Sequence, residues 1–253
     1  MSDSDSEPEL STAALTALKQ FYTEKESRQK AFEDLKAVAS TNFSTDSPSP
    51  SLKYPLSMEA FTEDWNASQF WYTDSTATRL ATQLLQNSTP ETRICVLSAP
   101  SVFLQLKNLL NEWPADKARP AAITLLEFDT RFAVFGDEFQ YYDFKFPTKL
   151  PVELKARFDV IILDPPFLSE DCQAKTAVTV GWLAKCWEGE GVRVVACTGE
   201  RMEGLVHRLY GKVGVRTTDF VVEHAKGLGN EFRCYANFEG GEWKLLGGVV
   251  GSG

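Results

Sequence analysis

The tetrapeptide Asp164-Pro165-Pro166-Phe167 has the residue types of a reactive site, and it follows the apolar run Val160-Ile161-Ile162-Leu163. Open parallel sheets bind ligands beyond the carboxyl ends of their strands, so a polar motif directly after a buried strand is a candidate site. The two prolines fix the backbone and leave carbonyls without competing local donors, beside a carboxylate and an aromatic ring. The motif therefore predicts a rigid, acceptor-rich slot for an amine. An isolated Asp-Pro-Pro would instead be an ordinary turn.

Acidic side chains end two further predicted strands. Glu127 follows residues 122–126, and a carboxylate in this place can accept hydrogen bonds from both hydroxyls of a ribose. Asp129 is the weaker candidate because it can cap the helix that follows. Asp143 ends a third predicted strand, where it could accept a hydrogen bond from an adenine amino group.

The turn after the first predicted strand consists of Ser98, Ala99 and Pro100 and contains no glycine. The Gly-x-Gly-x-x-Gly fingerprint of dinucleotide sites is therefore absent, and with it the usual cradle for a pyrophosphate. We expect any nucleoside bound at this turn to lack a diphosphate.

Aromatic side chains gather at Phe70, Trp71 and Tyr72, directly before a predicted helix. Three consecutive aromatics cannot all face one core. They either cover the sheet edge as a hydrophobic staple or wall a pocket, where a cation would be drawn to their faces. Asn230 and Phe232 belong to a second polar and aromatic cluster that enters the last predicted strand, which could equally be a strand with a buried ion pair.

The order of the predicted elements indicates an α/β fold. Apolar runs at residues 93–97, 122–126, 139–144, 158–163 and 192–196 predict strands, and segments of helix length at 101–112 and 174–187 fit crossovers of a parallel sheet. Residues 218–223 and 232–238 predict two more strands whose connection is too short for a crossover helix, so we expect this pair to be antiparallel. Residues 11–39 carry apolar side chains at three- and four-residue intervals and predict a long amphipathic helix.

Composition and charge exclude several classes of protein. The 253 residues hold 26 Lys and Arg against 35 Asp and Glu, a formal charge of −9 that disfavours nucleic acid as a partner. Five widely spaced cysteines and two histidines suggest neither a disulfide framework nor a metal site. No apolar run approaches the ~20 residues of a membrane span, and the acidic start is unlike a signal peptide. We expect a cytoplasmic protein.

Several of these motifs, taken together, resemble one known family. The motifs are Ser68 to Tyr72, Ser98 to Val102, Leu126 to Asp129 with Arg131 to Ala133, Asp164 to Glu170, and Asn230 to Tyr235. Their order and spacing are similar to those of the eukaryotic lysine methyltransferases of translation elongation factor 1-alpha. The resemblance covers roughly residues 10 to 243. One departure is Phe167, where many relatives have tyrosine, so any role for a hydroxyl there is lost.

The resemblance implies a Rossmann-like seven-strand methyltransferase fold with an N-terminal helical extension, S-adenosyl-L-methionine as cofactor, and methyl transfer to a lysine of elongation factor 1-alpha. Methylation of an adenine in nucleic acid is the alternative, because the same slot would hold its amino group. We expect an acidic tail at 1–9, a helix and linker at 10–55, a methyltransferase domain at 56–246, a tail at 247–253, and a monomer.

The site residues fall into three groups. Asp164, Pro165, Pro166 and Phe167 are expected to be catalytic, and no metal is expected. The cofactor group is Ser98, Ala99, Pro100, Glu127 and Asp143, and the substrate group is Phe70, Trp71, Tyr72, Asn230 and Phe232.

Overall fold

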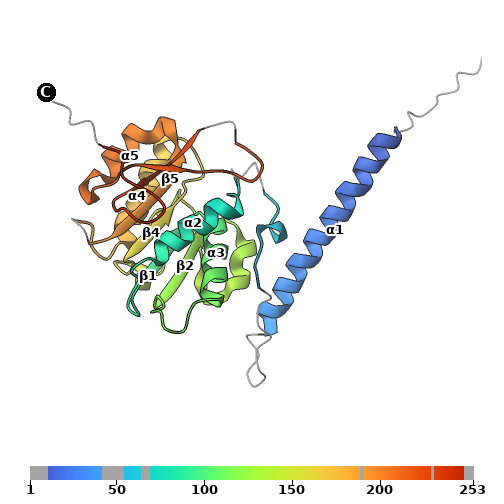
Figure 1. Ribbon diagram of the computed structural model, residues 1–253, viewed down its shortest axis with the longest axis horizontal. Coiled ribbons are helices and arrows are strands. Elements are labelled where there is room, and N and C mark those ends of the chain that lie inside the picture. Colours follow the sequence, from blue (N-terminus) through green and yellow to red (C-terminus); the bar gives the residue numbers. More distant parts are fainter. Residues whose placement is uncertain (1–10, 42–53, 64–68, 189–190, 229–230, 248–253) are drawn as a thin grey trace, which may run out of the picture. The chain divides into compact units, whose positions relative to one another are not determined.

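The computed structural model describes residues 11–41, 54–63, 69–188, 191–228 and 231–247, drawn as coloured ribbon in Figure 1. The chain divides into two compact units. The first contains helix α1 (Thr12–Thr41) together with Glu59–Thr62, where the rings of Phe32 and Phe61 meet edge to face at 5.8 Å. The second contains all of the strands. The predicted N-terminal helix is thus present, although Leu18 and Phe21 of its apolar stripe are exposed.

The second unit is built on one seven-stranded sheet with the order β3-β2-β1-β4-β5-β7-β6. Its strands are β1 (Arg93–Leu97), β2 (Ala122–Glu127), β3 (Phe139–Tyr141), β4 (Val160–Leu163), β5 (Arg193–Gly199), β6 (Arg216–Val221) and β7 (Phe232–Ala236). β1 to β5 pair in parallel, whereas β7 runs antiparallel to both β5 and β6. The predicted seven-strand α/β fold and its antiparallel pair are confirmed.

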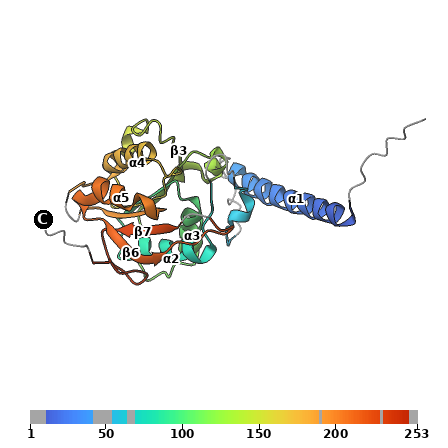
Figure 2. The same cartoon turned by 90° about the horizontal axis from the view of Figure 1, so that it is seen from above.

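Helices cover both faces of this sheet. α2 (Asp74–Leu85) and α3 (Pro100–Asn111) pack together on one face, and α4 (Glu170–Leu183) and α5 (Glu203–Tyr210) on the other (Figure 2). The central strands read as continuous apolar runs because both of their faces are buried. All four residues of β4 are buried, and Cys95 of β1 and Cys197 of β5 are fully enclosed, as expected for small apolar side chains.

The strand order reverses between β1 and β4, which are neighbours although β2 and β3 intervene in the sequence. Two chain connections leave in opposite directions at such a switch point and open a crevice beyond the carboxyl ends of the strands. The turn at Ser98 follows β1 and the motif at Asp164 follows β4, so the fold brings them side by side. The backbone N–H of Asp164 donates to the carbonyl of Leu97 at 3.0 Å.

Some predicted boundaries were wrong. β3 ends at Tyr141 instead of Phe144, because the chain turns at Asp143, whose carboxylate accepts from the backbone N–H of Lys145. α4 begins at Glu170, four residues before the expected start, because the Ser169 side chain caps it by accepting from the N–H of Cys172. In the described part of the chain, no helix is long and apolar enough to cross a membrane.

Candidate active site

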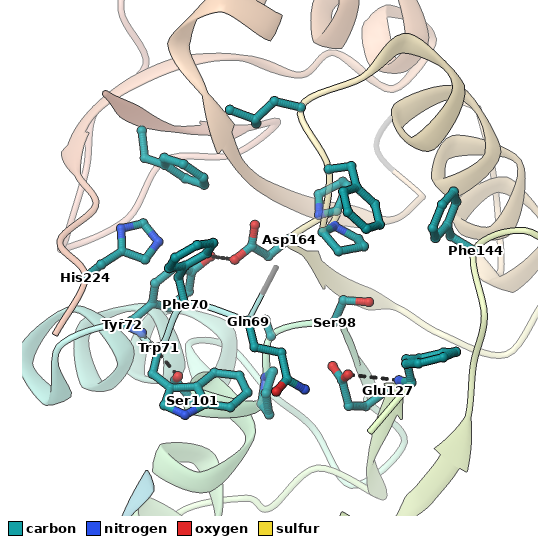
Figure 3. A pocket seen from close by; sticks show the side chains of 18 of the residues that line it. Gln69, Phe70, Trp71, Tyr72, Ser98, Ser101, Glu127, Phe144, Asp164 and His224 are labelled. Atoms are coloured by element: carbon teal, nitrogen blue, oxygen red, sulfur yellow. Dashed lines mark hydrogen bonds between the residues drawn. The ribbon is translucent and has the colours of Figure 1, made fainter. Parts of the chain in front are cut away.

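A cavity of about 580 Å³ opens at the carboxyl ends of β1, β2 and β4 (Figure 3). Among the residues that the structure describes, every predicted site residue lines it: Asp164, Pro165, Pro166, Phe167, Ser98, Ala99, Pro100, Glu127, Asp143, Phe70, Trp71, Tyr72 and Phe232. Asn230 lies outside the described residues. Segments up to 162 positions apart in the sequence, from Phe70 to Phe232, therefore meet around one space.

Asp164 lies at the centre of the cavity wall, directly after β4. Its Oδ2 accepts a hydrogen bond of 2.5 Å from the hydroxyl of Tyr72, whereas its Oδ1 has no partner among the described residues. Burial raises the pKa of Asp164 from 3.8 to about 7, against the lowering effect of the Tyr72 hydrogen bond, and the nearby charge of Glu127 raises it further. The carboxyl group can thus change its protonation state near neutral pH.

Glu127 ends β2 and is only 6% exposed. Its Oε1 accepts from the backbone N–H of Phe128 at 2.9 Å (Figure 3). It also accepts from the N–H of Asp129 at 3.1 Å, and the two bonds fix the carboxyl group. Oε2 has no hydrogen-bond partner in the part of the chain that is described. Burial raises the pKa of Glu127 from 4.5 to about 7. A carboxylate oxygen without a partner at the edge of a cavity is suited to accept from a ligand hydroxyl.

Asp129 is used differently, as the sequence suggested. Its carboxylate caps the turn at Thr130–Glu138 by accepting from the N–H of Arg131, forms an ion pair with the Arg131 guanidinium at 2.5 Å, and accepts from Gln69 at 3.1 Å. These hydrogen bonds to Arg131 and Gln69 lower the pKa of Asp129 against the effect of burial. Its acceptor capacity is taken up by the protein itself.

The turn after β1 adopts an uncommon backbone conformation. Ser98 has a φ of 54°, in the left-handed region that favours glycine, and its N–H donates to the carbonyl of Leu126 at 2.9 Å. α3 begins two residues later, with Ala99 at its N-cap and Pro100 in its first turn. Strained residues of this kind persist where the surrounding structure fixes them, which is common at ligand sites.

The aromatic rings of Phe144 and Phe167 form another part of the cavity wall. Phe167 is 39% exposed and its ring lies 5.6 Å from that of Phe144. The sequence interpretation assigned Phe144 to a strand end and missed its position at the cavity, since only the turn at Asp143 brings it there. Asp143 also lines the cavity, from the turn beyond β3.

The segment from Gln69 to Tyr72 crosses this edge of the sheet and is held from both sides. The N–H of Trp71 donates to Oε1 of Glu63 at 2.9 Å, and the side chain of Glu63, only 2% exposed, forms an ion pair with Lys226. The carbonyl of Trp71 accepts from the N–H of Ala225 at 2.8 Å. Trp71 and Tyr72 are both buried, so the aromatic run forms a wall of the cavity and not a cover over the sheet edge.

His224 completes that wall and was not recognised from the sequence. Its ring lies 5.2 Å from Tyr72 and 4.6 Å from Phe232, and residues 72 and 224 form an isolated antiparallel bridge. Burial lowers the pKa of His224 from 6.5 to about 4, so the imidazole is neutral at physiological pH. The place of His224 in the cavity wall follows only from its contacts in the folded structure, because the residues next to it in the sequence form no motif.

The cavity suits an adenosyl sulfonium ligand. Its volume admits a nucleoside with a short amino acid chain, and the unpartnered Oε2 of Glu127 can accept from ribose hydroxyls. The carboxyl groups of Glu127 and Asp164 have no cationic side chain in ion-pair contact among the described residues, which favours a positively charged ligand. The described residues contain no cluster of His, Cys, Asp and Glu that could hold a metal ion.

Comparisons with known proteins agree with this geometry. A family model described as "Probable N6-adenine methyltransferase" matches residues 63–240. The protein-lysine N-methyltransferase EFM5 of Saccharomyces cerevisiae is 41% identical over 93% of this chain and 94% of that protein. EEF1A lysine methyltransferase 1 is 36% identical in Mus musculus, over 95% of this chain and 96% of the relative, and 36% identical in Homo sapiens, over 94% and 96%. The chain therefore belongs to the family of EFM5 and the EEF1A lysine methyltransferases, a family of protein-lysine N-methyltransferases.

Proposed function

We propose that this protein transfers a methyl group from S-adenosyl-L-methionine to the ε-amino group of a lysine in elongation factor 1-alpha, as a cytoplasmic monomer. The position of Asp164 carries the proposal, because it presents an unpartnered carboxylate oxygen at the switch point, beside aromatic rings and the turn after β1. The names of the relatives support elongation factor 1-alpha as the substrate.

The cofactor supplies an electrophilic methyl group on a sulfonium. Within the proposal, Glu127 holds the ribose through Oε2, and Ser98, Ala99 and Pro100 contact the cofactor beside the N-terminus of α3. Asp143 is proposed to accept from the adenine amino group. These residues orient the cofactor and take no part in bond making, so positioning is the main contribution of this part of the site.

The chain's second task is to present a neutral amine. At pH 7.4, only about one in a thousand lysine side chains with a pKa near 10.4 is neutral. Deprotonating the lysine at this pH therefore costs about 4 kcal/mol of free energy. A partly buried site lined by aromatic rings favours the neutral form. Oδ1 of Asp164 and the carbonyl of Pro165 are proposed to accept the N–H groups of the amine and aim its lone pair, while Pro166 fixes the turn.

Phe167 and Trp71 are proposed to exclude water and hold the apolar stem of the lysine, with Phe70 and Phe232 on the same wall. Rings at this position would also attract the cationic head of an arriving lysine. Residue 167 is a phenylalanine and has no hydroxyl, but the site still contains a phenol, because the hydroxyl of Tyr72 donates to Asp164.

A nucleic-acid amino group is the second candidate, because the slot is open to an adenine and Phe167 could stack on it. The charge of −9 opposes it, since binding of nucleic acid depends on cations that replace the counterions of the phosphates. An acidic protein attracts a basic protein surface instead.

The test is methyl incorporation from radiolabelled S-adenosylmethionine into a cell lysate, treated in parallel with nuclease or protease. We expect the label in a protease-sensitive, nuclease-resistant product of the size of elongation factor 1-alpha, and in the purified folded factor. Asp164→Ala should abolish it. Asp171→Asn is the matched control, because Asp171 is exposed on α4 and forms an ion pair with Lys175 outside the cavity. Label in nucleic acid exceeding that in any protein would contradict the proposal.

A further inference from the structure

The hydroxyl of Tyr72 makes a contact that packing alone does not require. Tyr72 is 3% exposed, and its phenol donates to Oδ2 of Asp164 at 2.5 Å although the two residues are 92 positions apart. Most buried hydroxyl groups have a hydrogen-bond acceptor, and any backbone carbonyl would serve. Here the acceptor is instead the carboxyl group at the centre of the cavity, and the bond uses one of its two oxygens (Figure 3).

Three contacts fix the position of Tyr72. Its backbone N–H donates to Oγ of Ser101, in the first turn of α3, at 3.3 Å. The N–H of Thr73 donates to the carbonyl of Glu223 at 2.9 Å, beside the bridge between Tyr72 and His224. The imidazole of His224 packs edge-on against the phenol ring. The phenol ring is therefore held by the scaffold, with its hydroxyl 2.5 Å from Oδ2 of Asp164.

We propose that Tyr72 is a positioning residue for methyl transfer: by donating to Oδ2 it fixes the rotation of the Asp164 carboxylate and leaves Oδ1 as the acceptor that faces the substrate amine. This inference rests on the proposed function and deepens it. The sequence interpretation placed Tyr72 in the substrate group, and the hydrogen bond to Asp164 adds a role for its hydroxyl.

The same bond sets when Asp164 is ionised. A donor to the carboxylate favours the charged form, and removing it raises the pKa of the acid. A protonated Asp164 could present an O–H to the amine where an acceptor is needed. With the Tyr72 hydrogen bond, Asp164 therefore stays ionised, and able to accept a hydrogen bond from the amine, at a lower pH than it would if it were buried without this bond.

The groups that surround Asp164 determine which titrations an experiment will see. Glu127 faces it from β2, Cys197 from β5 and Cys172 from α4. The hydrogen bond with Cys234 and burial raise the pKa of the Cys197 thiol, and burial raises that of Cys172, so both thiols stay neutral. His224 is neutral above about pH 5 because its pKa is lowered to about 4. Arg201 lines the same cavity. Burial also raises the pKa of Glu127 to about 7, so Glu127 titrates in the same range as Asp164.

The test is Tyr72→Phe, which keeps the ring against His224 and removes only the hydroxyl. The rate constant kcat is measured from pH 5.5 to 9.5 at saturating S-adenosylmethionine and saturating elongation factor 1-alpha, so that binding at Glu127 does not limit the rate. We expect the acid limb to move up by about one pH unit, the scale of one hydrogen bond to a charged acceptor. One unit below the wild-type midpoint, kcat should then fall about tenfold, while the KM for the cofactor stays the same.

Tyr210→Phe is the matched control. Tyr210 is fully buried, and its hydroxyl has no hydrogen-bond partner in the described structure, so this variant also loses a buried phenol. It lies outside the cavity, and its pH profile should equal that of the wild type. A loss in Tyr72→Phe that is uniform across pH, or no loss, would overturn the inference.

A second measurement does not need the substrate. In protein labelled with ¹³C at the aspartate carboxyl carbons, the Asp164 signal, assigned by its absence in Asp164→Asn, should titrate about one unit higher in Tyr72→Phe. An unchanged midpoint overturns the inference even if the enzyme is active. If elongation factor 1-alpha is not methylated at all but the midpoint moves, the proposed substrate fails and the role of Tyr72 stands.

Discussion

Replacing Glu127 by glutamine tests the cofactor site with the smallest change of shape. In the protein, Oε1 of Glu127 is fixed by the N–H groups of Phe128 and Asp129, and only Oε2 is available to a ligand. In Glu127→Gln the amide oxygen would keep the two backbone donors, so an NH₂ group would face the ribose. The ligand would lose a charged acceptor and meet a donor in its place.

The expected loss follows from that exchange. Hydrogen bonds to charged groups contribute about 1.5 to 3 kcal/mol, so we expect S-adenosylmethionine to bind about 10- to 150-fold more weakly. Asp129→Asn is the matched control, because the oxygens of Asp129 are already occupied by Arg131 and Gln69. Asp129→Asn should lower the melting temperature and leave the affinity for S-adenosylmethionine nearly unchanged.

Isothermal titration of the purified proteins with S-adenosylmethionine, at one pH and one salt concentration, measures both affinities. Thermal unfolding of the same samples shows whether each variant is folded. If Asp129→Asn weakened binding more than Glu127→Gln, or if Glu127→Gln bound normally, the ribose site would not be at Oε2 of Glu127.

Three further outcomes follow from the site. Asp164→Asn should lower kcat, measured at saturating S-adenosylmethionine, by at least about 100-fold, the scale attributed to one positioned catalytic group; a kcat near that of the wild type would contradict this. Without cofactor, the melting temperature measured by differential scanning calorimetry should fall as pH rises from 5 to 7.5. The folded protein raises the pKa of Asp164 and Glu127 to about 7, so it binds more protons than the unfolded chain, and this contribution to stability is lost as pH rises through 7. Asp164→Asn should make this fall in melting temperature smaller. Binding of S-adenosylmethionine should tighten from pH 6 to pH 8, and that of S-adenosylhomocysteine should tighten less, because only the former carries a sulfonium charge near the ionising carboxyl groups; equal pH slopes for the two ligands in calorimetry would contradict this.

The strands and the site motif could be predicted because they depend on local patterns. β4 is a run of apolar residues that must be buried on both faces, so the position of Asp164 at its end follows from the sequence. The antiparallel pairing of β6 and β7 follows from the short connection between them. Both inferences need only neighbours in sequence.

The contacts that define the roles of individual side chains could not be predicted in this way. The bond between Tyr72 and Asp164 and the contact between His224 and Phe232 depend on the register of the sheet and on where a connecting segment crosses its edge. Phe144 reaches Phe167 only because the chain turns at Asp143. A one-residue change in such a turn would send these rings elsewhere, and nothing in the pattern of residue types fixes it.

The acidic groups at this edge of the sheet are of two kinds. Glu63 and Asp129 are paired, with Lys226 and Arg131, and these carboxylates hold the aromatic segment and a turn in place. Glu127 and Asp164 have no such ion pair among the described residues, although burying a carboxyl group without one is unfavourable. The raised pKa means that ionising each carboxyl group costs about 3 to 4 kcal/mol more in the folded protein than in the unfolded chain. A positively charged sulfonium bound in the cavity would offset part of that cost. The unpaired carboxyl groups of Glu127 and Asp164 therefore favour a cationic ligand, whereas Glu63 and Asp129 already have cationic partners in the protein.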